Sequence, residues 1–444
     1  MHSRRDRSTA RRPWRARRPR ALARLVAVTA SLVVLAGCGG GSHPNGGASA
    51  PLSPTAVAGS DTSVRPLPGF VPASASFPSA RVGFAWGVSP CPRTDAFCGG
   101  LAGTTDGGKT WHALTAPAGL PANPYRTAVL RFANPLDGWA ALGSLQATHD
   151  GGRSWAAVHL DGLADPSVSA VATAGGYVFV VATDARTMGA ALRLYVSPIA
   201  DNRFTAVPGI KLPSLASRVD LSFDPTGARG YLAVSSLGAA PLLLRSRGAT
   251  GWQQLPVPCA AGSNLAVGAG SGAEVTVLCD TPTSATTSVK TVWTSTDAGS
   301  HFVQQGMPGP AGYTTDVAQA PDQAMPEGLF SPRSTPAASS SASAPSTSAA
   351  RLVVAASARE DRLYLTDNGG QSWKIAYANS SDGSGSGLGL SDLAFSDPTH
   401  GSVVLGNTGL YVRDRLAGRH LVPGPRLLLT QDGGAHWSQS VVAE

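Results

Sequence analysis

The residues best suited to chemistry in this sequence are short polar side chains at the start of apolar segments. Three are aspartates, Asp220, Asp316 and Asp392, and the fourth is Asn264. Their oxygens could contact a ligand or a cation, and two carboxylates about 6.5 to 9.5 Å apart could hydrolyse a glycosidic bond with inversion. The alternative is structural, because short polar side chains at strand ends often hydrogen-bond to nearby backbone. The four residues are the candidate ligand-binding set, and both interpretations stay open.

The net charge of +8 is concentrated at the N-terminus. Residues 1–37 carry ten Arg and one Asp, a charge of +9, so the rest of the chain carries −1. A nearly neutral chain gives no electrostatic reason to bind nucleic acid. Cys-x-x-Cys spacing and clustered His are both missing, which argues against a zinc site. The sequence therefore predicts no nucleic-acid partner, no metal and no cofactor.

The N-terminus has the features of an export signal followed by a lipid attachment site. The apolar run Leu25–Ala36 follows the Arg-rich stretch and is too short to span a bilayer comfortably. Leu35-Ala36-Gly37-Cys38 resembles a bacterial lipobox, which implies removal of residues 1–37 and lipidation of Cys38. An ordinary signal with a chance Cys is the alternative.

The segment after Cys38 is predicted to be a linker, residues 38–75. It is rich in Gly, Ser, Pro and Ala up to about Leu67, a composition typical of a disordered tether. We therefore expect an extracytoplasmic protein held on the bacterial cell membrane by its lipid anchor.

Four cysteines remain beyond Cys38, an even number, as expected where disulfides persist. Cys91 and Cys98 bracket a short loop, and Cys259 and Cys279 bracket a predicted strand. These two pairings are the economical ones, so we predict two disulfides.

One octet occurs five times, at 104–111, 148–155, 295–302, 366–373 and 430–437. Each copy has an acidic or amide residue third, a Gly fifth and an aromatic last. The Asp can accept hydrogen bonds from turn N–H groups, the Gly supplies positive φ, and the aromatic begins the next strand. The third residues are Asp106, Asp150, Asp297, Asn368 and Asp432.

The octet resembles the Asp-box, or BNR, repeat of sialidase-like β-propellers. In that family the box is a structural turn far from any active site, so the resemblance implies a fold and leaves function open. The non-enzymatic Asp-box proteins, including photosystem II assembly factors of Ycf48 type, are similar over nearly all of the mature chain.

The spacing of the boxes predicts a single all-β propeller over residues 76–444. Degenerate boxes end at Phe204 and Trp252, so closing aromatics recur every 44 to 50 residues across the first five units. Two longer units follow, with insertions at 331–350, which is low in complexity, and at Asp414–Pro425. The pattern predicts seven four-stranded blades.

The predicted topology divides the loops between two faces. Box turns and first-to-second-strand turns share one face, the box face. The opposite face carries the second-to-third and fourth-to-first connections, including both predicted disulfides. Sialidase-like propellers resemble one another in placing their sites there, and we expect the four candidate residues to line the channel mouth on this face.

Catalysis is not expected. The Arg-Ile-Pro or Arg-Leu-Pro motif of sialidases is absent, and the chain has only four Glu. Most Trp belong to boxes, which leaves few aromatics for a sugar-binding cleft. We expect a monomeric, non-catalytic propeller that binds a protein or a glycan through channel-side loops. The alternative is a secreted glycoside hydrolase, which would need two facing carboxylates and at least two exposed aromatics.

Overall fold

The computed structural model describes residues 67–122, 128–236, 238–283, 288–307, 313–319, 351–357, 360–380, 389–419 and 424–442. These residues all belong to one compact unit, Asp61–Glu444. The signal segment, Cys38, the tether as far as residue 66 and the insertion 331–350 lie outside the described residues.

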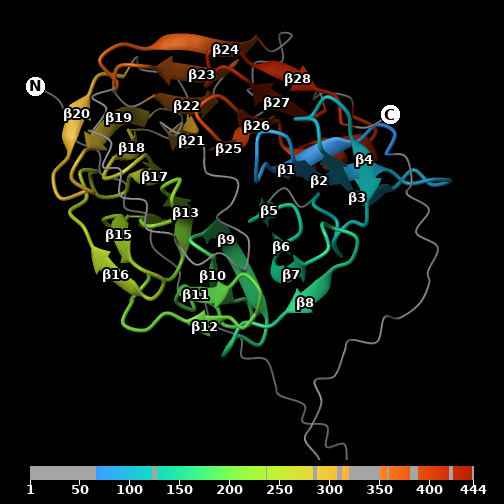
Figure 1. The fold of residues 1–444 in the computed structure, drawn as a ribbon, viewed down its shortest axis with the longest axis horizontal. Helices are drawn as coiled ribbons and strands as arrows, with labels where there is room; N and C mark the ends of the chain where they lie inside the picture. Colours follow the sequence, from blue (N-terminus) through green and yellow to red (C-terminus); the bar gives the residue numbers. More distant parts are fainter. Residues whose placement is uncertain are drawn as a thin grey trace, which may run out of the picture. The chain divides into compact units, whose positions relative to one another are not determined.

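Seven antiparallel sheets, each of four strands consecutive in the chain, make up the unit. The first strands of neighbouring sheets contact one another, and β1 contacts β25, so the sheets close into a ring around a channel (Figure 1). The prediction of an all-β propeller with seven four-stranded blades is confirmed.

The strand bounds follow the chain. The first four blades contain β1 (Val71–Ser76), β2 (Gly83–Pro90), β3 (Phe97–Thr104), β4 (His112–Leu114); β5 (Val129–Phe132), β6 (Gly138–Leu142), β7 (Ser144–Thr148), β8 (Ala156–Val158); β9 (Pro166–Ala174), β10 (Tyr177–Asp184), β11 (Arg193–Pro198), β12 (Thr205–Ala206); β13 (Ala216–Phe223), β14 (Gly230–Ser236), β15 (Leu242–Arg247) and β16 (Gly251–Gln254). The last three contain β17 (Asn264–Ala269), β18 (Val275–Pro282), β19 (Ser288–Ser295), β20 (Val303–Gln305); β21 (Tyr313–Gln319), β22 (Leu352–Ser357), β23 (Glu360–Thr366), β24 (Lys374–Ser380); β25 (Leu390–Phe395), β26 (Gly401–Leu405), β27 (Arg426–Thr430) and β28 (Ser438–Ser440).

A phenylalanine at the end of the first strand organises several blades. In blade 2, Phe132 pairs with Gly138, and a Cβ on that glycine would lie 2.5 Å from the phenyl ring. The same ring meets the box residue Trp155 edge-on, with centroids 6.2 Å apart. Phe395, Gly401 and Trp437 repeat the arrangement in blade 7. The repeated Phe and Gly of the sequence are therefore one packing unit with the box aromatic.

The ring closes between blades 7 and 1 without exchanging a strand. Blade 1 is built entirely from the start of the propeller and blade 7 entirely from its end. Their facing sides share an apolar cluster that includes Ala85 and Ala102 of blade 1 and Val404 and Leu427 of blade 7. Across the seam, the Trp111 indole donates to Ser440 Oγ at 3.0 Å. Side-chain packing and hydrogen bonds therefore hold the closure.

Two boundaries differ from the sequence prediction. The first strand begins at Val71, inside the segment expected to be linker, and Leu67 and Phe70 before it are buried. Pro72 makes this strand hard to predict, because proline is disfavoured inside strands. A register shift between Pro72 and Ser74 accommodates the proline.

The seventh unit also differs, because its insertion contains a helix, α1 (Thr408–Leu416), where an irregular segment from Asp414 was expected. Asn407 caps α1 by accepting a hydrogen bond from Leu410 N at 2.9 Å.

Candidate functional site

The channel opens on the opposite face through a polar cavity of about 480 Å³. Its walls include the starts of the first strands of blades 3, 4 and 7 and the turn at Gly143, which places it opposite the box face. The described residues that line it include no aromatic side chain. The polar members of the lining are Arg131, Arg218, Asp220, Asp392, Ser167, Ser169, Ser217 and Ser391.

A second cavity, of about 510 Å³, opens toward the box face and is lined by first-to-second-strand turns. Its walls are more apolar and include Phe132, Phe223 and Phe395. Both cavities are lined by Arg131, Asp220 and Leu221. These three residues therefore mark the waist where the two halves of the channel meet.

Asp392 positions Arg131 at this waist. The Arg131 guanidinium donates to Asp392 Oδ1 at 2.9 Å and to its neighbouring carbonyl of Leu130 at 2.7 Å. The other Asp392 oxygen accepts from the Ser74 hydroxyl and from Ala75 N. Asp392 has φ +56° at a register shift in β25, a conformation that non-glycine residues rarely adopt. Backbone strain of this kind commonly accompanies functional positions.

A second arginine–aspartate pair lies in blade 4. Arg218 and Asp220 approach to 3.6 Å, and their side chains are 23% and 21% exposed, so both are accessible from the cavity yet partly shielded. Such partly buried pairs are screened less by salt than surface pairs.

The candidate carboxylates also join neighbouring blades. Among the described residues, first-strand side chains of blades 1, 4 and 7 accept hydrogen bonds from the first-strand backbone of the next blade. Examples are Ser74 with Leu130 N at 2.9 Å, Asp220 with Val267 N at 3.0 Å, and Asp392 with Ala75 N at 3.2 Å. The structural role considered for these residues is thus present in the structure, and a binding role stays a prediction.

The other two candidates are placed differently. Asp220 pairs with Ala233, three residues into β14, whereas Asn264 pairs with Asp280, five residues into β18. The repeats of the sequence align Asn264 with Asp220, but in the structure Asn264 lies two residues nearer its strand start, and it accepts from the Ser217 hydroxyl at 3.2 Å. Asp316 pairs with Ala355, and its side chain lies outside the described residues.

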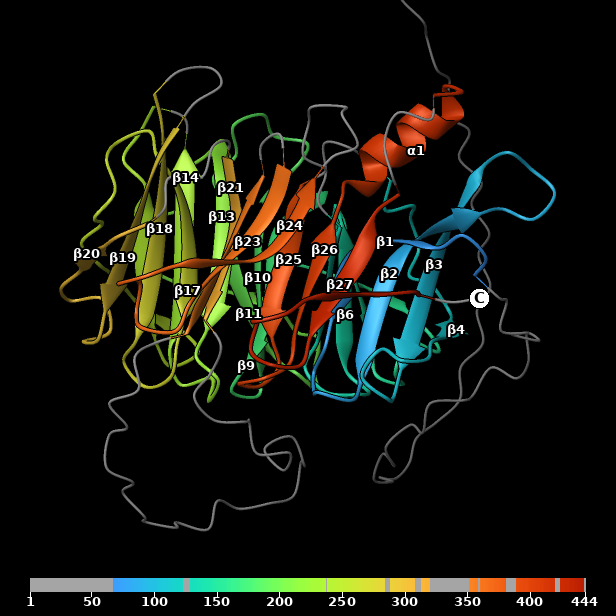
Figure 2. The same ribbon diagram turned by 90° about the horizontal axis from the view of Figure 1, so that it is seen from above.

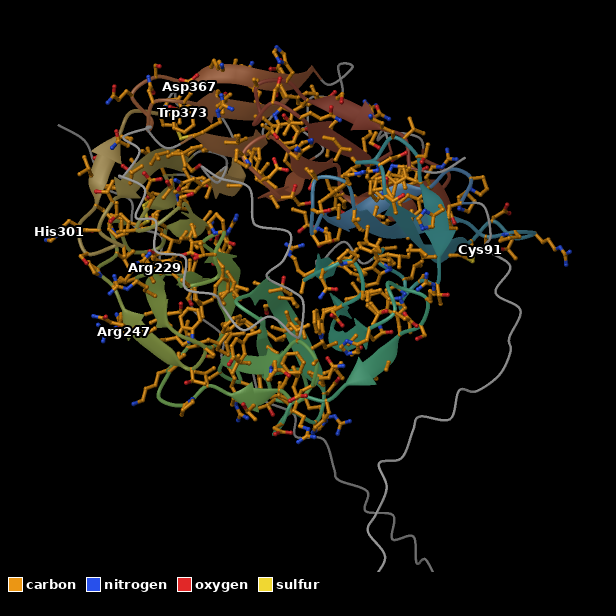
Figure 3. The ribbon with its side chains drawn as sticks, viewed as in Figure 1. Cys91, Arg229, Arg247, His301, Asp367 and Trp373 are labelled. Carbon is orange, nitrogen blue, oxygen red and sulfur yellow. A yellow bond between two sulfur atoms is a disulfide. The ribbon has the colours of Figure 1, made fainter. Side chains whose placement is uncertain are left out.

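Both predicted disulfides are present, Cys91–Cys98 and Cys259–Cys279. The first closes the β2–β3 hairpin, whose residues from Pro92 to Ala96 are exposed (Figure 3). The second ties β18 to the connection that precedes β17. Both lie on the opposite face, and Figure 3 shows Cys91 at the outer edge of the ring, so the first disulfide stiffens a peripheral hairpin.

The boxes are built alike. In the second copy, the carboxylate of Asp150 accepts from Arg153 N and Ser154 N at 2.9 Å, and the Thr148 hydroxyl accepts from Gly152 N at 3.0 Å. A Cβ on Gly152 would lie 2.9 Å from Leu101 of the preceding blade. The box glycine is therefore needed both for its φ of +82° and for close packing between blades.

Box electrostatics follow from these contacts. The Thr110 hydroxyl and backbone N–H hold the pKa of Asp106 well below its ordinary value. For Asp432, partial burial would raise the pKa, but hydrogen bonds from His436 and the Thr430 hydroxyl outweigh it and lower the pKa to about 2. His301 pairs with its box aspartate at the periphery (Figure 3), and His436 pairs in the same way with Asp432. Among the described residues no cluster of His, Cys, Asp and Glu could hold a metal ion.

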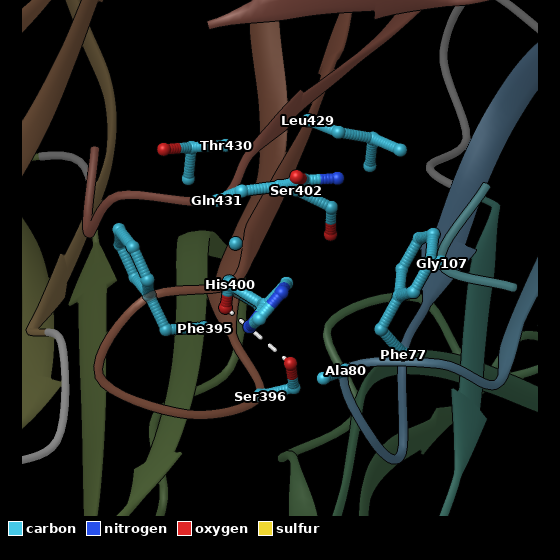
Figure 4. A pocket seen from close by; sticks show the side chains of 12 residues that line it. Phe77, Ala80, Gly107, Phe395, Ser396, His400, Ser402, Leu429, Thr430 and Gln431 are labelled. Carbon is cyan, nitrogen blue, oxygen red and sulfur yellow. Dashed lines mark hydrogen bonds between the residues drawn. The ribbon is translucent and has the colours of Figure 1, made fainter. Parts of the chain in front are cut away.

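A third cavity lies on the box face at the seam between blades 7 and 1. It is lined by Phe77, Phe395 and His400, and its volume of about 30 Å³ suits a single water molecule (Figure 4). It is too small for a ligand.

Sequence reasoning missed the two arginines of the channel. Arg131 lies in the apolar segment Val129–Phe132, and Arg218 lies in β13, two residues before the candidate Asp220. An arginine between buried neighbours in a channel-lining strand is the signal that could have identified the first of them.

Together, fold and site define a seven-bladed β-propeller with a polar channel mouth. No model of a known protein family matches the chain, and no curated protein matches it. No helix among the described residues is long and apolar enough to cross a membrane.

Solved structures show similar folds. A structure of YCF48 bound to D1 peptide covers 83% of this chain and 96% of its own at 16% identity, with a TM-score of 0.47. The BP39L lectin from Burkholderia pseudomallei covers 84% and 100% at 13% identity, with a TM-score of 0.50. A GH74 xyloglucanase from Xanthomonas campestris covers 85% and 73% at 13% identity, with a TM-score of 0.40. At these identities the likeness concerns the fold alone.

Proposed function

We propose that this chain is a non-catalytic, membrane-anchored propeller that binds a protein partner at the channel mouth of the opposite face. The supporting observation is the pair of arginines that line the cavity of the opposite face, Arg131 at its waist and Arg218 in blade 4. Arg131 is held by Asp392, and Arg218 by Asp220, inside a cavity large enough for an inserted segment of a partner. Guanidinium groups held in this way present directed hydrogen-bond donors to carboxylate or carbonyl oxygens.

The same cavity argues against the glycoside hydrolase. Enzymes and lectins that hold sugars commonly stack them on aromatic rings, and the described lining of this mouth contains none. Asp392 is also occupied by Ser74, Ala75 and Arg131, which leaves little freedom for an acid or base role. A protein partner therefore fits the mouth better than a glycan.

Anchoring is the second part of the proposal and rests on Leu35-Ala36-Gly37-Cys38. Cys38→Ala should release the protein from the membrane fraction or block its processing. Unchanged membrane partitioning with unchanged mature size would refute lipidation.

The binding site is tested by a pull-down from membranes with the full chain. We expect a partner that is enriched by the wild type and lost with Arg131→Ala, while the melting temperature shows that the variant is folded. Arg153→Ala, which removes an exposed arginine on the box face, is the matched control and should retain the partner. Equal recovery with both variants would place the site elsewhere.

A further inference from the structure

Helix α1 stands on the opposite face, above the ends of the blade strands (Figure 2). It occupies the connection between β26 and β27, and its contacts reach blade 1. The Thr408 hydroxyl donates to the carbonyl of Pro72 at 2.7 Å, and Val412 packs with Val71 and Val88. The helix is thus fixed to the body of the propeller by its inner side.

The inner side is reinforced by aromatic packing. Tyr411 meets Phe97 of the β2–β3 hairpin edge-on, with ring centroids 5.9 Å apart. This contact joins α1 to the hairpin closed by the Cys91–Cys98 disulfide. The Arg415 guanidinium lies over the same Tyr411 ring, 5.9 Å from its centroid. The helix is therefore held in place by its inner side chains, and Arg415 packs over one of them.

The outward side of α1 and the residues just after it combine positive charge with an apolar side chain. Arg413, Arg415 and Arg419 are exposed, and Leu416 between them is 60% exposed. Asp414 is the only acidic residue of the segment, and it is buried with one oxygen 3.3 Å from Arg413. We call Arg413, Arg415, Leu416 and Arg419 the α1 patch; its net charge is positive.

A helix end alone does not account for this composition. Arginines in the last turn complement the partial negative charge of a helix C-terminus, which explains Arg413 and Arg415. It explains neither Arg419, which lies beyond the helix, nor an exposed leucine in the midst of three arginines. Basic side chains around an apolar one are typical of surfaces that contact anionic lipid.

The chain enters the propeller on the same side of the molecule. Leu67 and Phe70 pack against Gly100, and Gly69 lies against Pro90, at the end of β2 that leads into Cys91. Only 28 residues separate Cys38 from Leu67. A Gly/Ser-rich chain of that length has a reach of about 30 Å, so an anchor at Cys38 would keep the α1 patch close to the membrane.

We propose that the α1 patch binds the anionic headgroups of the membrane and so orients the propeller on it. The physiological setting of this inference rests on the proposed anchoring. The lipid contact itself depends only on residues of the propeller. Arginines near a negatively charged lipid surface contribute about fivefold each to the partition coefficient. Three of them are expected to change binding on the order of 100-fold.

The test uses the propeller from Asp61 onward, which forms one compact unit. Co-sedimentation is measured with phosphatidylcholine vesicles, with and without phosphatidylglycerol, at low and high salt. The wild type should bind the phosphatidylglycerol vesicles preferentially and lose this binding at high salt. Replacing Arg413, Arg415 and Arg419 by Ala should abolish the preference, and Leu416→Ala should weaken binding more mildly.

The control variant carries Ala in place of Arg153, Arg203 and Arg247, so it loses the same charge. Arg153 and Arg203 are exposed in turns on the box face, and Arg247 is exposed at the end of β15 beside such a turn. This variant should bind as the wild type does. Equal loss in both triple variants, or no preference for phosphatidylglycerol, would overturn the proposal. Retention on a polyglutamate matrix through the α1 arginines without vesicle binding would also overturn it, in favour of an acidic protein. Since the tested unit lacks Cys38 and keeps Arg131, failure of anchoring or of partner binding leaves this result unchanged.

Discussion

Replacing Asp150 by Ala removes the acceptor on which the second box depends. Its carboxylate receives four hydrogen bonds, from Arg153 N and Ser154 N at 2.9 Å, from the Thr148 hydroxyl at 2.8 Å and from the Ser154 hydroxyl at 2.6 Å. Arg153 and Ser154 are exposed, so water can replace part of what is lost. We therefore expect a loss of about 1 to 3 kcal/mol in the free energy of unfolding, the range for stranded donors.

The chain supplies its own control for this prediction. In the fourth box Asn368 Oδ1 accepts from Ser372 N at 2.9 Å, and its amide donates to the Ser372 hydroxyl at 2.7 Å. Asp150→Asn should preserve the same contacts with Ser154 and cost less than about 1 kcal/mol.

Differential scanning calorimetry measures both variants, with a change in melting temperature of roughly 1 to 2 °C expected for each kcal/mol in a unit of this size. Asparagine as costly as alanine, or alanine without effect, would refute the acceptor role. Partner binding by folded Asp150→Ala should match the wild type, and its loss with an unchanged melting temperature would contradict a purely structural box.

Three further outcomes are expected. The pKa of Asp432 in the folded protein is lowered to about 2, so its ionised form stabilises the fold above its ordinary pKa of 3.8. This contribution to stability is lost as the pH falls from 3.8 through 2. The melting temperature should therefore fall over this range, and it should fall less in Asp432→Asn. Gly138→Ala should lower the free energy of unfolding, measured with urea, by about 1 to 3 kcal/mol because the new Cβ would meet Phe132. Gly268→Ala should be close to neutral, because a Cβ there would lie 3.5 Å from its nearest neighbours. Equal losses in the two variants would contradict the packing argument. Deleting 331–350 should leave melting temperature and partner binding unchanged, since loop length affects stability only slowly; lost binding would move the site to the box face.

The parts of the fold that could be predicted are those with local chemical causes. The octet predicts a turn because its hydroxyl and its carboxylate accept hydrogen bonds from backbone N–H groups, including that of the glycine, within the same eight residues, as in 148–155. The Phe132, Gly138 and Trp155 unit likewise lies within one blade. These signals recur often enough to count blades, including the two whose boxes are degenerate.

The site was less predictable because its contacts cross the ring. Arg131 is positioned by Asp392, 261 residues later in the chain, and no local pattern marks that pair. Asn264 was aligned with Asp220 from sequence, but the strand register separates them by two positions. Helix α1 follows the capping residue Asn407 and has an apolar side chain, Leu416, on its exposed side, so periodicity gave it little support.

The closure between blades 7 and 1 has a consequence for biogenesis. Since no strand crosses the seam, all four strands of blade 1 are present early in synthesis, but its flank at Ala85 and Ala102 stays uncovered until Leu427 follows, more than 300 residues later. Every incomplete propeller therefore exposes two apolar flanks. One is the flank of blade 1, and the other is the flank of the blade that formed last. Contacts so distant in sequence form slowly, and exposed apolar flanks invite association between copies. The vulnerable interval in the life of this protein is the time between its first blade and its last.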